Sequence, residues 1–162
     1  MDRLLFALWF FAALGAGLIG GLFFAFSTFV MTALGRLPPS GGIAAMQSIN
    51  VAVLNPTFFA AFFGTAALSV VALIVALMRW SEPGAGYLLV GSLLYLIGTI
   101  FVTMAGNVPL NNALARVKPD SAEGASLWKQ YLSTWAAWNH VRTIASLVAA
   151  ASFIMALVRL PN

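Results

Sequence analysis

One short stretch of this chain combines side chains that can do acid–base and electrostatic chemistry. Residues 135–143 hold the single histidine of the chain, His140, and an arginine two residues later, Arg142. His140 is the natural general base or acid, because imidazole titrates near neutral pH. Arg142 supplies a fixed positive charge that can stabilise an enolate or a phenolate. The stretch leads into a long apolar segment, and ionisable groups at a membrane are costly, so both residues are candidates for function.

The composition indicates an integral membrane protein. Of the 162 residues, 62% are hydrophobic and 7% are charged, and the mean hydropathy is +0.97. Soluble domains carry about 25% charged residues, so a water-soluble fold could not cover its surface with so few charges. The eight Lys and Arg residues are scattered along the chain, which argues against nucleic-acid binding. We expect a multi-pass protein whose partner is the lipid bilayer, located in a bacterial inner membrane. The sequence does not set the oligomeric state.

Four apolar segments are each long enough to cross a bilayer. They cover about residues 4–31, 53–78, 86–106 and 139–159. These segments must be helices, because a chain in lipid has to satisfy its own backbone hydrogen bonds. We therefore predict an all-α fold in which residues 1–162 form a single four-helix transmembrane domain.

Two further helical pieces are predicted outside the membrane spans. After the first span, Ile43, Met46 and Ile49 recur at helical spacing, which predicts an amphipathic helix on the bundle or at the interface. Before the fourth span, Asp120 or Ser121 can cap a new helix. This helix would stand above the membrane and then continue into it.

A stripe of aromatic residues follows one face of that last helix. Its aromatic members are Trp128, Tyr131, Trp135 and Trp138, at spacings of three and four, and Arg142 continues the same spacing. Residues at these spacings lie on the same side of an α-helix. The stripe is either an aromatic belt at the membrane interface or one wall of a ligand pocket.

The alternation of the four spans brings a set of polar residues to one side of the membrane. They are Arg36, Gln47, Asn50, Asn55, Asn107, Asn111, Asn112, Asn139, His140 and Arg142. With Trp135 and Trp138, we expect them to line a site for a lipophilic small molecule, because amides form hydrogen bonds and aromatic rings cover a flat apolar substrate. The other interpretation is structural: these side chains satisfy backbone carbonyls at broken helix ends, and Asn55 caps the helix that starts at Pro56.

The residue inventory argues against a metal site built by the protein. Cysteine is absent, and the acidic residues are Asp2, Glu82, Asp120 and Glu123. A zinc or di-iron site needs several His, Cys, Asp or Glu ligands, and a hydrolytic triad needs a carboxylate near His140. We therefore expect no metal, and a haem with His140 as one axial ligand is the alternative.

Four motifs of this chain resemble a known membrane family, and the resemblance covers nearly its whole length. They are Gly20–Ser27, Met46–Asn50 followed by Asn55-Pro56, Asn107–Asn112, and Trp135–Thr143, of which the last two are the more specific. The chain resembles the family that includes the fungal anthrone oxygenases and a largely uncharacterised bacterial branch.

The resemblance implies oxidation of a phenolic anthrone to the quinone by dioxygen, without an added cofactor. In that chemistry His140 would remove a proton from the ring carbon, and Arg142 with Asn107 or Asn111 would stabilise the enolate. Excluding water would protect the intermediate. Two other functions stay open: a protein that binds haem or a quinone, and a structural or transport component without chemistry.

Overall fold

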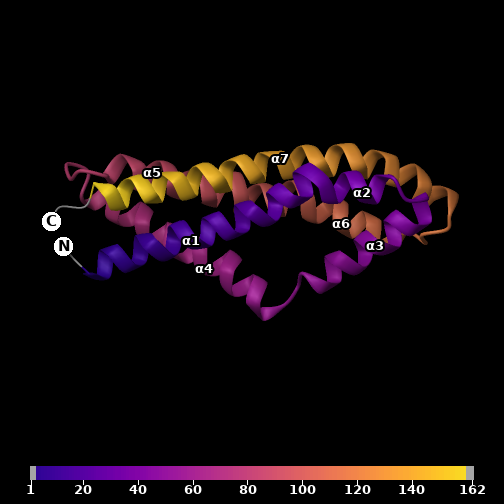
Figure 1. Cartoon of the computed structure of the whole chain (residues 1–162), viewed down its shortest axis with the longest axis horizontal. Helices are drawn as coiled ribbons and strands as arrows, with labels where there is room; N and C mark the ends of the chain where they lie inside the picture. The colour runs from indigo at the N-terminus through magenta and orange to yellow at the C-terminus, as the bar shows by residue number, and fades with distance from the viewer. Residues whose placement is uncertain (1–2, 160–162) are drawn as a thin grey trace.

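The computed structural model describes residues 3–159, and these residues form a bundle of long helices (Figure 1). Four of its helices are long and apolar enough to cross a membrane: Arg3–Gly35, Pro56–Met78, Ala85–Arg116 and Ala122–Val158. The described residues contain no strand. The prediction of an all-α, four-helix transmembrane bundle is confirmed. Residues 1–2 and 160–162 of the predicted 1–162 domain lie outside the described residues.

The first and last helices form the long axis of the molecule. Helix α1 (Arg3–Ala25) continues through the π-helical turn η1 (Phe26–Val30) into α2 (Met31–Gly35). Helix α7 (Ala122–Val158) lies against α1 and has 37 residues, or about 55 Å at 1.5 Å per residue. The hydrocarbon core of a bilayer is only about 30 Å thick, so α7 extends well beyond it, as the predicted helical extension requires. Ser121 caps α7, accepting a hydrogen bond from the Gly124 N–H at 3.0 Å.

The predicted amphipathic helix is α3 (Pro39–Ala52), which packs against α2, α6 and α7. Its apolar residues Ile43 and Met46 are buried beside Trp128 and Tyr131 in a cluster of apolar side chains. Gly42 permits the close approach, because a Cβ there would lie 2.8 Å from the Trp128 ring. Figure 1 shows α3 meeting α4 (Pro56–Met78) at an elbow that points away from the bundle.

The third long helix continues past its predicted end. We predicted a span of about 86–106, whereas the structure has α5 (Ala85–Leu93), the π-helical turns η2 (Leu94–Phe101) and η3 (Thr103–Asn107), and α6 (Val108–Arg116) in one continuous helix. Pro109 does not end this helix. A π turn widens the backbone just ahead of the proline, where a regular α-helix would need the N–H that proline lacks.

Candidate functional site

Helices α1, α3, α4, α6 and α7 enclose a pocket of about 390 Å³, which we call the Arg142 pocket. Ligand sites in proteins commonly measure about 300–1,000 Å³. Most of the lining is apolar and includes Phe23, Phe26 and Phe58. The polar lining residues are Asn50, Thr103, Asn111, Trp135 and Arg142. A flat apolar molecule in this pocket would therefore meet mostly apolar side chains and a few polar groups.

Arg142 is buried, with 4% of its surface exposed. Its Nη2 donates to Asn139 Oδ1 at 2.7 Å, and its Nη1 donates to Thr103 Oγ1 at 3.3 Å. The guanidinium carbon lies 4.0 Å from the centre of the Phe23 ring and 5.2 Å from that of Trp135. Within the described residues, its Nε has no hydrogen-bond partner and no carboxylate forms an ion pair with it. A buried cation without an anion is costly, so this guanidinium is suited to an anionic or electron-rich ligand.

Asn139 holds Arg142 in place through a hydrogen bond. Its side chain is fully buried and donates from Nδ2 to the Phe23 carbonyl oxygen and to Ser27 Oγ, each at 2.8 Å. Its Oδ1 accepts the hydrogen bond from Arg142, so one amide links the guanidinium to α1 at the start of the η1 turn. The π-helical turn is a local widening of α1 of the kind that is frequent at functional sites.

Asn111 is held by two aromatic side chains. Its Oδ1 accepts hydrogen bonds from the Tyr131 hydroxyl at 2.7 Å and from Trp135 Nε1 at 2.8 Å. Tyr131 stacks between Trp128 and Trp135, with ring centres 5.5 and 5.8 Å apart. The aromatic stripe of α7 thus forms part of the pocket wall and also fixes an amide on the facing helix.

A second chamber of about 400 Å³ adjoins the Arg142 pocket. The two share the lining residues Asn50, Leu54, Val108 and Asn111. Gln47 and Asn112 line only the second chamber. Asn112 is exposed, so this chamber borders the surface of the molecule.

Three predicted site residues do not join this group. His140 is exposed and lines neither cavity, because residues two apart on a helix face opposite sides and Arg142 faces inward. Arg36 is exposed where α2 ends. Trp138 is 42% exposed and packs on Gly106, while Asn139 takes the inward position on α7. The expectation that these three residues line the site is wrong for this structure.

Three other predicted site residues have structural partners. Asn55 caps α4, accepting from the Phe58 N–H at 3.0 Å, as the structural interpretation proposed. Gln47 donates to the carbonyl oxygens of Leu114 and Val117 at the end of α6, at 2.8 and 3.0 Å. Asn107 is buried and donates to the Trp135 carbonyl oxygen at 3.1 Å, while its Oδ1 has no partner among the described residues.

Sequence reasoning missed Thr103, Phe23 and Phe26 as parts of the site. Thr103 accepts the hydrogen bond from Arg142, and the two phenylalanines form the α1 wall of the pocket. Thr103 lies four residues before Asn107, which was a candidate, so the helical spacing could have indicated it. The phenylalanines carry no such signal, because apolar residues fill every face of α1.

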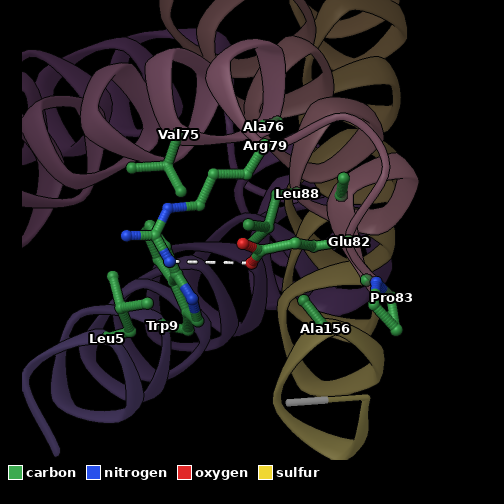
Figure 2. Close-up of a pocket in the computed structure, with 11 residues that line it drawn as sticks. Leu5, Trp9, Val75, Ala76, Arg79, Glu82, Pro83, Leu88 and Ala156 are labelled. Atoms are coloured by element: carbon green, nitrogen blue, oxygen red, sulfur yellow. Dashed lines mark ion pairs between the residues drawn. The ribbon is translucent and has the colours of Figure 1, made fainter. Parts of the chain in front are cut away.

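The opposite end of the bundle holds a different kind of arginine. Figure 2 shows Arg79 pointing toward Glu82, above Leu5 and Trp9 of α1. Arg79 Nη1 lies 3.6 Å from Glu82 Oε2, and both side chains are about half exposed. The cavity beside them measures only about 20 Å³, which is too small for more than a water molecule.

The described residues contain no group of three His, Cys, Asp or Glu side chains that could hold a metal ion. The Arg142 pocket also has no carboxylate or imidazole in its lining. The chemistry that its own side chains offer is hydrogen bonding, aromatic contact and one positive charge.

The comparisons with known proteins agree with the resemblance seen in the sequence. The family model described as anthrone oxygenase matches residues 56–152, which is more than half of the 162 residues. The match covers α4 through most of α7 and includes Asn111, Asn139 and Arg142. A search of curated proteins and a search of solved structures gave no match. By its sequence this chain belongs to the anthrone oxygenase family.

Proposed function

We propose that this protein is a membrane-embedded oxygenase that uses dioxygen to oxidise a lipophilic phenolic small molecule of the anthrone type. The observation that carries the proposal is the burial of Arg142, without a carboxylate partner, on the wall of a largely apolar pocket. Membership of the anthrone oxygenase family supports the reaction class. The bacterial inner membrane is the location that belongs with this proposal.

The overall reaction balances without another reagent. An anthrone carries a CH₂ group opposite its ketone, and its conversion to the quinone replaces the two hydrogens by one oxygen. One dioxygen molecule takes up four electrons, supplies that oxygen and leaves the second oxygen as water. The substrate is oxidised and dioxygen is reduced, so no added oxidant or reductant is required.

Arg142 has the central part in this proposal. Loss of a proton from the CH₂ group places negative charge on the ketone oxygen, and the resulting enolate is electron-rich enough to react with dioxygen. A guanidinium on the wall of a largely apolar pocket stabilises that oxygen more strongly than it would in bulk solvent. Asn139 and Thr103 keep the guanidinium in position. Phe23 and Trp135 also line the pocket, where their rings can contact the ring system of the substrate.

The proposal assigns no protein side chain as the base. His140 lies outside both cavities, and the lining of the Arg142 pocket offers no carboxylate or imidazole. The positive charge instead makes the bound substrate more acidic, so that water reaching it through the second chamber can accept the proton. We propose that no resident cofactor takes part.

The direct test is turnover of 1,8-dihydroxyanthrone by purified protein in lipid nanodiscs. We expect quinone formation faster than autoxidation, one dioxygen consumed per quinone, and one ¹⁸O atom in the quinone when ¹⁸O₂ is supplied. The matched control is Arg142→Met, which should return the rate toward autoxidation. A wild-type rate equal to autoxidation, or a haem absorption band in the active protein, would contradict the proposal.

A further inference from the structure

We propose that the second chamber is a subsite for an uncharged, hydroxyl-bearing substituent of the substrate. This inference rests on the proposed function, because it assumes that the ring system of the substrate lies in the Arg142 pocket. It concerns a different part of the cavity and a different property, namely which substituted substrates the protein prefers.

The two cavities adjoin at four residues that line both, and we call this boundary the junction. Asn50 of α3 and Asn111 of α6 belong to this junction, together with Leu54 and Val108. The volumes are similar, about 390 and 400 Å³. In this proposal a ligand fills the first cavity with a flat ring system and extends a substituent past the junction into the second.

The orientation of the Asn111 amide is fixed by its partners. Trp135 Nε1 and the Tyr131 hydroxyl both donate to Asn111 Oδ1. An indole N–H can only donate, so a flipped amide would place two donors together. The Asn111 NH₂ group must then point away from Trp135, and it makes no hydrogen bond to another described residue. The junction thus carries a donor in a fixed direction.

The remaining lining supplies both donors and acceptors but no charge. Both hydrogens of the Gln47 amide are used by the Leu114 and Val117 carbonyls, which leaves its Oε1 as an acceptor. Asn112 is exposed and can both donate and accept, and Asn50 supplies a further amide with both capacities. No charged side chain lines this chamber. A hydroxyl, which donates and accepts, matches such a lining, whereas a charged group would lose hydration without gaining an opposite charge.

The test compares two ligands that differ by one oxygen atom. They are 1,8-dihydroxyanthraquinone with a methyl group at position 3 and the same quinone with a hydroxymethyl group there. We expect the wild-type protein in nanodiscs to bind the hydroxymethyl compound roughly three- to ten-fold more tightly, as one or two added hydrogen bonds would give. Quenching of tryptophan fluorescence reports the dissociation constant.

Asn112→Leu and Asn50→Leu should bring the ratio of the two dissociation constants toward one. The matched control is Gln130→Leu, which removes an exposed amide that lines neither cavity and should leave the ratio unchanged. Equal binding of both quinones by the wild-type protein, or a ratio that both asparagine variants preserve, overturns the subsite. If neither quinone binds to the wild-type protein, both the subsite and the proposed function are overturned.

These outcomes separate the subsite from the reaction. A protein that shows the expected ratio but oxidises no anthrone would contradict the proposed function and support the subsite as a binding site. A protein that oxidises the anthrones corresponding to these two quinones but binds the two quinones equally would contradict the subsite alone.

Discussion

Arg79 and Arg142 are two arginines of one bundle in opposite surroundings. Arg79 lies at the end where α4 finishes, half exposed and 3.6 Å from a carboxylate, beside a cavity of about 20 Å³ (Figure 2). Arg142 lies halfway along α7, 4% exposed, without an ion-pair partner among residues 3–159, beside a cavity of about 390 Å³. The first arrangement anchors a helix end. The second keeps a charge at a cost to stability, and such a cost is explained most simply by binding or catalysis.

The largest effect should come from removing the buried charge. Arg142→Met keeps most of the side-chain volume, and we expect anthrone turnover in nanodiscs to fall at least about 100-fold, as when an enzyme loses a group that stabilises a developing oxyanion. The same substitution at Arg79 is the control and should leave turnover unchanged. Equal rates for the Arg142 variant and the wild type would remove the functional contrast between the two arginines.

Giving Arg142 a carboxylate should make it resemble Arg79. Asn139→Asp would place an anion where Asn139 Oδ1 now accepts a hydrogen bond at 2.7 Å. We expect turnover to fall about ten-fold or more, because the new ion pair competes with the substrate oxygen for the positive charge. Ser27→Ala is the control, since it removes one partner of Asn139 without adding charge. Full activity in the aspartate variant would show that activity does not depend on Arg142 lacking a carboxylate partner.

Removing the Asn111 amide should reduce stability. Asn111→Leu leaves the Tyr131 hydroxyl and the Trp135 N–H without their acceptor, and we expect the free energy of unfolding to fall by about 2 kcal/mol or more. Reversible denaturation in detergent measures this loss. The neighbouring Asn112→Leu should change stability little, because Asn112 is exposed. Similar losses in both variants would contradict the account of Asn111.

The ion pair at the other end should contribute little. Arg79→Gln breaks the contact with Glu82, and we expect the free energy of unfolding to change by less than about 1 kcal/mol, as is usual for exposed pairs. The same denaturation measurement checks this value. A loss as large as that of Asn111→Leu would mean that Arg79 is more than a surface anchor.

The smallest effect should come from the residue that seemed most suited to chemistry. His140→Ala should leave turnover unchanged between about pH 5 and pH 8, because His140 is exposed and outside both cavities. A pH–rate profile that loses its acidic limb in this variant would restore His140 as the base, because a base is inactivated when it is protonated at low pH.

The fold could be predicted from sequence because hydropathy and segment length determine how many helices cross a membrane. The amphipathic helix and the long last helix were also evident, from the spacing of Ile43 and Met46 and from the cap at Ser121. The end of the third helix was not evident from the sequence. Proline usually stops a helix, and nothing in the sequence shows that a π turn will accommodate Pro109.

The candidate site could be predicted only in part, since composition identifies polar residues but not the direction in which each one points. Of the predicted site residues, Arg142, Trp135, Asn50 and Asn111 line the pocket. His140 could have been excluded from the list of pocket residues, because residues two apart on a helix face opposite sides and Arg142 faces inward. The distinction between Asn111, which is held by Trp135, and the exposed Asn112 required the positions of the facing helices.

The central claim is that Arg142 stabilises negative charge on a molecule bound in the pocket. It is tested most directly by spectroscopic titration of bound 1,8-dihydroxyanthraquinone, whose colour reports ionisation of its phenol. We expect the phenol pKa to be about 1 to 3 pH units lower in the wild-type protein than in Arg142→Met, because an opposite charge close to an acid favours its ionised form. Equal phenol pKa values in the two proteins would contradict the claim.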